Sequence, residues 1–218
     1  MNLIKKTIPC LAVAAILTTG CSGAKTTIKA DKFKEEVTEY GFLLNRTAKY
    51  EGTVDLGESG SGKYELFADS DGKNIAFANV FTGAEGSETY GFRGTIESGN
   101  VSGVLYMRDG DEEWDTTPVS NLPNAIFSLY LFEFTYFGPF AYEKFTYDKK
   151  EKAYTAKKYN FTLDETNIRF KDMSLRFKSN QLVGWKYIMG IDDSSQSITI
   201  DMERSATKGV EVPVPVGE

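Results

Sequence analysis

The chain has 218 residues, enough to bury one sizeable core, and its 31 acidic and 25 basic residues give a formal net charge of −6. This acidic balance disfavours nucleic acid and anionic lipid head groups as partners. The sequence contains no histidine, which excludes serine–histidine and cysteine–histidine catalysis and the usual zinc and copper sites. Carboxylate-only chemistry, such as hydrolysis, stays open, as does calcium binding by oxygen ligands, but we expect no metal or cofactor.

The N-terminal residues have the pattern of a bacterial lipoprotein signal. Lys5 and Lys6 precede an apolar run, Ile8 to Leu17, that is too short to span a bilayer as a mature helix, and small residues lead to Cys21. We predict that residues 1–20 are a cleaved signal peptide and that the Cys21 thiol carries a covalent lipid. An ordinary secretory signal cut near the same place is the alternative.

This prediction places the protein outside the cytoplasm, tethered by its lipid. The membrane would be the outer membrane of a Gram-negative cell or the outer face of the cell membrane of a Gram-positive one. Residues 21–30 are then a short polar tether, and residues 31–218 are a single domain. The only other cysteine, Cys10, lies in the signal, so no internal disulfide can form and stability depends on core packing.

A helix is predicted from about residue 31 to 46, because Phe33, Val37, Tyr40 and Leu44 recur at helical spacing and line one face. The charged residues of the same segment lie away from that face: Lys34, Glu35, Glu36 and Glu39.

From Lys49 onward the hydrophobic period changes to two, which is typical of strands with one buried and one exposed face. In one such strand the predicted buried face carries Tyr90, Phe92 and Ile96. Turn sequences such as Asp71-Gly72 and Ser179-Asn180 separate these runs. We expect about nine or ten strands in one long, mostly up-and-down antiparallel meander.

One region interrupts the alternation. The stretch from Phe127 to Tyr147 holds ten aromatic residues, and 125–134 is apolar nearly all round, which predicts a helix without a solvated face. Such a helix is either a plug that fills the concave face of the sheet or a movable wall of a lipid-sized pocket. A membrane or partner contact is a third interpretation.

Several short motifs are better explained as turns than as sites. Gly57 to Lys63 has P-loop spacing, but Tyr64 replaces the magnesium-binding hydroxyl and a strand follows where a helix is required. Asp69 to Gly72 begins like a calcium loop but lacks its final bidentate glutamate. The acidic cluster Asp109 to Glu113 is expected to be a solvated loop. Trp114 and Trp185 suit core or rim packing better than sugar stacking.

The layout resembles a known superfamily. A lipoprotein signal, a tether, an amphipathic helix and an antiparallel meander with an apolar insertion are followed by the segments Phe145 to Tyr154, Phe177 to Val183 and Val210 to Pro215. This order is similar to that of the half-barrel superfamily of periplasmic lipoprotein carriers and mycobacterial lipid-binding lipoproteins. The resemblance implies a curved sheet around a helix-plugged apolar cavity that takes acyl chains.

We therefore predict a mainly β fold: a single antiparallel curved sheet, half-barrel or open barrel, with an N-terminal helix and a central apolar helix in its concave face. The predicted function is non-enzymatic binding of a lipid or acyl chain. The candidate ligand-binding residues are Phe127, Tyr130, Leu131, Phe134 and Trp185. The alternative is a surface scaffold lipoprotein with a filled core, which would present an acidic rim and an exposed Trp114 to a protein or glycan partner.

Overall fold

A computed structural model of the chain describes residues 26–123, 137, 139–163, 166–191 and 197–216. Its main feature is one eleven-stranded antiparallel sheet in the order β6-β5-β4-β3-β2-β1-β11-β10-β9-β8-β7. The strands are β1 Ala48–Asp55, β2 Ser61–Ser70, β3 Asn74–Thr82, β4 Ser87–Glu97, β5 Asn100–Asp109, β6 Asp115–Pro123, β7 Thr146–Asp148, β8 Ala153–Leu163, β9 Thr166–Lys178, β10 Gln181–Ile191 and β11 Ser197–Ala206.

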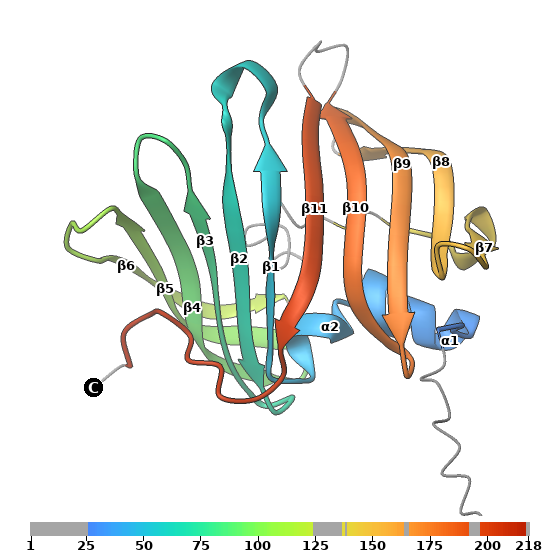
Figure 1. Ribbon diagram of the computed structural model, residues 1–218. Coiled ribbons are helices and arrows are strands. Elements are labelled where there is room, and N and C mark those ends of the chain that lie inside the picture. The colour runs from blue at the N-terminus through green and yellow to red at the C-terminus, as the bar shows by residue number, and fades with distance from the viewer. Residues whose placement is uncertain (1–25, 124–136, 138, 164–165, 192–196, 217–218) are drawn as a thin grey trace, which may run out of the picture.

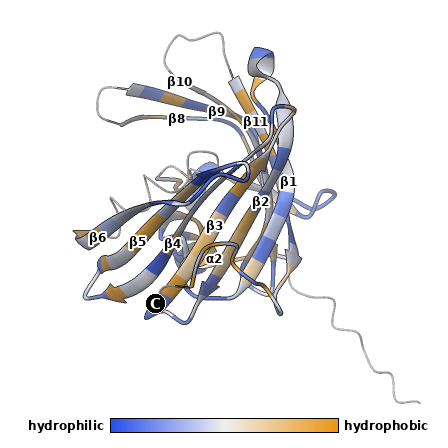
Figure 2. Ribbon diagram, turned by 90° about the vertical axis from the view of Figure 1, so that its left-hand side faces the viewer, coloured by the Kyte–Doolittle hydropathy of each residue, from blue (hydrophilic) through white to orange (hydrophobic). Residues whose placement is uncertain are grey.

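The predicted mainly β fold with a curved open sheet is confirmed, and the order of the strands explains the curvature. Two meanders, β1 to β6 and β7 to β11, are joined where the first strand pairs with the last, with Val54 opposite Ile200. From this seam the sheet bends into two walls, one leading to β6 and the other to β8, that diverge from each other (Figure 2). Connecting the two meanders takes the chain from one edge of the sheet to the other.

The expected number of strands was too low, for two local reasons. β7 spans only Thr146–Asp148, too short to show a two-residue period. β6 contains Pro118 and Pro123, and proline within a run argues against a central strand but is tolerated at a sheet edge. β6 is such an edge, so both prolines are compatible with its position.

The predicted N-terminal helix is present only in pieces. α1 Ala30–Phe33 continues into a π-helical turn at Lys34–Thr38, and α2 Gly41–Leu44 follows a left-handed residue, Tyr40, with φ of 55°. A positive φ is unfavourable for a bulky residue. The Tyr40 hydroxyl donates a hydrogen bond to the Phe137 carbonyl at 3.0 Å, which helps to hold this conformation. The apolar side chains of the predicted stripe are all buried nevertheless.

A buried ion pair attaches this helical segment to the sheet. Glu36 was expected on the solvated side of a regular helix, but only 3 % of it is exposed. Both carboxylate oxygens accept hydrogen bonds from the Arg46 guanidinium, and Oε2 also accepts one from the Leu182 backbone N–H at 2.8 Å. Because all three bonds converge on one carboxylate, the segment is fixed against the start of β10.

The concave face of β8 to β10, here called the filled wall, is covered by aromatic side chains from the N-terminal segment and from residues 137–145. The Phe33 ring centroid lies 5.3 Å from that of Phe145 and 5.7 Å from that of Phe177. Phe140 packs edge-to-face on Phe170 at 5.0 Å. These separations are those of favourable aromatic pairs, so this half of the core is densely packed.

The convex face of β3 to β5 has an apolar cover of its own. The segment after β11 runs across the sheet toward β4 and β5, in red in Figure 1, and buries Val212 and Val214 in a cluster with Ala78 and Tyr106. Arg93 donates hydrogen bonds of 3.3 Å to the carbonyls of Val212 and Val214. The strands β3 to β5, here called the open wall, are therefore packed from outside by this C-terminal strap, residues 210–216.

Candidate binding site on the concave face

Of the residues predicted to bind ligand, only Trp185 lies within the part of the chain that the structure describes. Cys21, Phe127, Tyr130, Leu131 and Phe134 all lie outside it, as does the predicted central helix. Trp185 points into the concave side of β10, where its ring centroid lies 5.1 to 5.4 Å from those of Tyr50, Phe137 and Phe42. None of the Trp185 surface is exposed. In this structure the side chain is therefore part of the packed core beneath the concave face and is not accessible to a ligand.

A second group of concave-facing residues, on the open wall, was not among the predicted ones. Tyr90 of β4 is directly opposite Met107 of β5, and the next row toward the strand ends pairs Glu88 with Asp109. In the other direction the next row pairs Phe92 with Leu105. Since side chains two residues apart share a face, the buried Phe92 and the pair Tyr90 and Met107 belong to one continuous surface.

The Tyr90 and Met107 pair is accessible to solvent. Tyr90 is 42 % exposed and Met107 is 43 % exposed, whereas Phe92 in the adjacent row is completely buried. Apart from Val216 in the strap, these are the large hydrophobic side chains that are exposed among the described residues. Because this exposed apolar pair continues the core onto an accessible concave face, it is a candidate contact surface.

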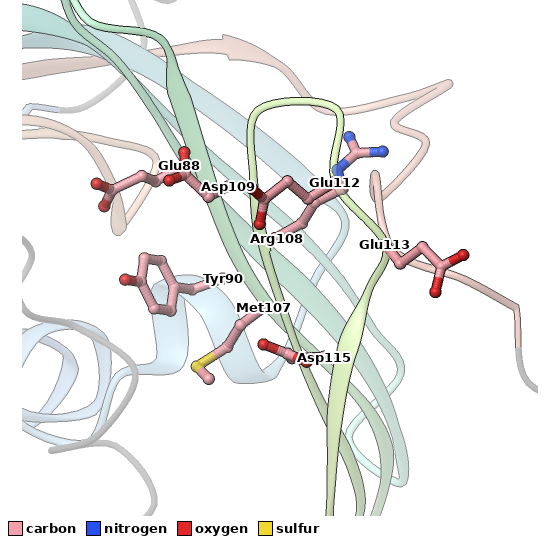
Figure 3. Close-up of a pocket in the computed structure, with 8 residues that line it drawn as sticks. All are labelled: Glu88, Tyr90, Met107, Arg108, Asp109, Glu112, Glu113 and Asp115. Carbon is pink, nitrogen blue, oxygen red and sulfur yellow. The ribbon is translucent and has the colours of Figure 1, made fainter.

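Two shallow hollows meet at this position. The first has a volume of about 220 Å³ and is shown in Figure 3, where Tyr90 and Met107 project to the same side and Asp115 lies beside Met107. The second, of about 350 Å³, extends toward Phe81 and the β3–β4 turn. Glu88 and Asp109 line both hollows and therefore mark the boundary between them.

The charge around the hollows is strongly negative. Their lining includes six carboxylates and one cationic side chain, Arg108. The six are Glu85, Glu88, Asp109, Glu112, Glu113 and Asp115. The Arg108 guanidinium lies 4.5 Å from the centre of the Trp114 ring, so it stacks on that ring. No ion pair within the described ranges involves any of the six carboxylates.

Trp114 is not the exposed aromatic platform that the scaffold hypothesis required. Its side chain is half-buried between Arg108 and Tyr106, whose ring centroid lies 6.1 Å away in an edge-to-face arrangement. The tryptophan packs with the strap cluster on the convex side of the open wall. It therefore contributes to the outer packing of β5 rather than to a contact surface.

Two glycines shape the floor of the site. Gly94 and Gly103 are opposite each other, and a Cβ on either would lie within 2.7 Å of the Phe92 ring. The Cζ end of the Phe92 ring therefore lies over both glycine positions. Glycine at such paired positions permits a close approach and a sharp bend of the sheet.

The sequence motifs that resembled catalytic or metal sites are turns. Gly57–Ser59 is a single turn of 3₁₀-helix between β1 and β2, and Asp71 caps the β2–β3 hairpin by accepting hydrogen bonds from the Lys73 and Asn74 backbone. The described residues contain no group of three or more acidic, histidine or cysteine side chains arranged to hold a metal ion. Most polar side chains that line the two hollows are carboxylates, and the others are the Tyr90 phenol, the Ser61 hydroxyl and the Arg108 guanidinium.

Comparison of the chain with protein-family models, with curated proteins and with solved structures found no match. Across the described ranges, no helix has both the length and the apolar character needed to cross a membrane.

Sequence reasoning assigned the correct face to Tyr90 but expected it to be buried. A usable signal was present: the residues two positions away toward the hairpin ends, Glu88 for Tyr90 and Asp109 for Met107, are acidic. Two residues along a strand return to the same face, so each apolar side chain had a charged neighbour on its own side. An apolar stripe that ends in carboxylates indicates where the buried surface stops.

Proposed function

We propose that this protein binds an apolar, lipid-like ligand on the concave face of its sheet and does not transform it chemically. The observation that carries the proposal is the continuity of that face: Phe92 is buried in the core, while Tyr90 and Met107 in the adjacent row are exposed beside a hollow. A ligand that covers the exposed row would extend the core outward and remove apolar surface from water.

The magnitude of this effect is sufficient for binding. At about 25 cal/mol per Å², burial of roughly 300 Å² of acyl surface supplies about 7 kcal/mol before the cost of ordering the ligand. The hollows are shallow, so a whole acyl chain would also need contact with the interior between the two walls. The proposed role of Phe127, Tyr130, Leu131 and Phe134 is to provide that contact.

The proposal includes a location. The lipoprotein signal pattern before Cys21 supports attachment of the protein to an extracytoplasmic membrane surface through a lipid on that residue. Such tethering would hold the concave face close to a source of lipid. Metabolic labelling with a radioactive fatty acid, compared between the natural chain and Cys21→Ser, tests this: label in the natural chain alone is the expected result.

The binding site is tested by truncating its exposed pair. Tyr90→Ala with Met107→Ala removes roughly 100 Å² of apolar contact, about 2.5 kcal/mol, which corresponds to a roughly 50- to 100-fold loss of affinity for an acyl probe. Because both side chains are more than two-fifths exposed, the free energy of unfolding should change by less than about 1 kcal/mol. Fluorescent fatty-acyl titration and urea unfolding measure the two quantities.

Val216→Ala is the matched control, because Val216 is 81 % exposed but lies on the strap outside the hollows. It should leave acyl binding unchanged. Equal affinity of the natural chain and the Tyr90/Met107 variant would contradict the assignment of the site. Phe127→Asp and Leu131→Asp, measured in the same assay, test the contribution of the predicted central helix.

The second candidate function is that of a scaffold lipoprotein whose interior is full. The dense aromatic packing around Trp185 favours it, because the filled wall offers no accessible apolar surface there. Native mass spectrometry of residues 25–218 separates the two candidates. A co-purifying lipid mass that is lost on delipidation and restored by added lipid supports binding; an apo mass that ignores added lipid supports the scaffold.

A further inference from the structure

We propose that the ligand of the concave face is a cationic amphiphile, and that Glu88 and Asp109 together receive its positively charged head group. This inference rests on the proposed function and adds to it the chemical class of the ligand. The amphiphile would place its apolar chain over Tyr90 and Met107 and its cation between the two carboxylates. An anionic lipid of the same chain length would be disfavoured.

The two acids lie at directly opposite positions on neighbouring strands. Glu88 and Asp109 are cross-strand partners on β4 and β5, so their side chains stand side by side on one face. Like charges directly opposite each other in an antiparallel pair repel and destabilise the sheet. Their same-face neighbours within β3, β4 and β5 are the uncharged Phe81, Tyr90 and Met107, and Asp115 of β6, opposite Met107, is another carboxylate.

A second acidic cross-strand pair in the same sheet shows how the chain neutralises such a pair. Glu51 of β1 and Glu65 of β2 are also direct cross-strand partners, on the convex face. There the Lys49 ammonium lies 2.6 Å from Glu51 and 2.7 Å from Glu65, and the Lys63 ammonium lies 2.9 Å from Glu65. The chain thus neutralises one glutamate pair with an ammonium group held between the two carboxylates.

The Glu88 and Asp109 pair has the same cross-strand geometry without the ammonium. No ion pair within the described ranges involves either residue. Arg108 also lines the first hollow, but its guanidinium stacks on Trp114 and makes no ion pair with Glu88 or Asp109. An ammonium group supplied by a ligand would remove the repulsion, as Lys49 does for the other pair. The binding energy of the cation therefore comes partly from relief of a cost present in the free protein.

The residues around the Glu88 and Asp109 pair favour an amphiphilic ligand. Both hollows are bounded by Glu88 and Asp109, and the apolar Tyr90 and Met107 occupy the adjacent row. A molecule that neutralises the Glu88 and Asp109 carboxylates and also covers Tyr90 and Met107 must be amphiphilic. Its cationic group must lie close to an alkyl chain. The other carboxylates, including Asp115 beside Met107, extend the negative field around the entrance.

The experiment compares three probes of one chain length: dodecylammonium, dodecyl sulfate and the uncharged dodecyl maltoside. Each is titrated below its micelle concentration into the natural chain, and affinity is measured by calorimetry. We expect dodecylammonium to bind at least about tenfold more tightly than dodecyl sulfate at low salt, with the preference shrinking as ionic strength rises.

The decisive variant is Glu88→Gln with Asp109→Asn, which removes both charges and keeps the side-chain shapes. The affinity for dodecylammonium should fall about tenfold while that for dodecyl maltoside stays unchanged. Glu151→Gln with Glu211→Gln is the matched control, because it changes the net charge equally at exposed positions away from the hollows. Its preference for the cationic probe should equal that of the natural chain.

The outcomes separate this inference from the function on which it rests. If all three probes bind equally, or if the control variant loses the preference as fully as the decisive one, the charge assignment is overturned while lipid binding stands. If no probe binds, the proposed function fails as well. Binding of a short oligolysine peptide without binding of any amphiphile would overturn the inference in favour of a basic protein partner.

Discussion

The filled wall and the open wall belong to one sheet but are packed from opposite sides. On β8 to β10 the concave face is covered by aromatic side chains of the chain's own segments, and the convex face carries charged residues such as Lys186, which pairs with Asp201 at 3.1 Å. On β3 to β5 the strap covers the convex face, and the concave row of Tyr90 and Met107 is accessible.

This difference explains how an open sheet can expose an apolar surface on one face and still remain folded. A wall that exposes hydrophobic side chains on one face has less core to stabilise it. The strap compensates from the other face, because Val212 and Val214 are buried against small residues of β3 and β4. A Cβ on Gly91 would lie 2.3 Å from a methyl carbon of Val214, so the glycine is what permits this approach.

The largest expected effect distinguishes the two walls directly. Trp185→Ala should lower the free energy of unfolding by about 3 to 5 kcal/mol, because it leaves a cavity among fully packed aromatic rings. Tyr90→Ala, the corresponding truncation on the open wall, should cost less than about 1 kcal/mol. Urea unfolding of both variants measures the difference, and equal losses would contradict the distinction between a filled and an open wall.

An intermediate effect is expected from the strap. Val214→Ala removes two buried methyl groups and should destabilise the protein by about 1 to 2 kcal/mol. Val216→Ala, at an exposed position two residues further along, should have almost no effect. Hydrogen exchange should locate the loss in β4 and β5 rather than in β9 and β10. Uniform loss of protection across the whole sheet would show that the strap does not act on the open wall separately.

These outcomes also bear on what the sequence could predict. Strand faces and turns follow from local patterns, and Asp71-Gly72 and Ser179-Asn180 do connect consecutive strands. Burial is different, because it depends on which distant segment covers a face. The two-residue period placed Tyr90 correctly beside Phe92, but no local pattern shows that residues 137–145 pack on β9 and leave β4 accessible.

The same reasoning explains the errors in the helical segment and at the C-terminus. Glu36 was assigned to the solvated side because a regular helix would put it there, and the π-helical turn rotates it toward Arg46 and Leu182. The family resemblance includes Val210 to Pro215 but does not predict that this segment covers the sheet. Its function as a cover depends on Gly91, Ala78 and Arg93, which are remote in sequence and carry no pattern that links them to it.

The smallest expected effect is a pH dependence in the hairpin that begins the open wall. Asp71 is exposed, and hydrogen bonds from the backbone and side chain of Asn74 and from the backbone of Lys73 lower its pKa to about 2 from a usual 3.8. Since the folded state favours the carboxylate, its contribution to stability is complete above the unfolded pKa and is lost as the pH falls through the folded one.

Asp71→Asn should therefore be less stable than the natural chain near neutral pH, and the stabilities of the two proteins should converge between about pH 4 and pH 2. Asp111→Asn, an exposed acid in the β5–β6 turn, controls for the change in net charge, and urea midpoints across this range measure the difference. A difference that grows toward low pH would mean that the Asp71 carboxylate does not hold the β2–β3 turn.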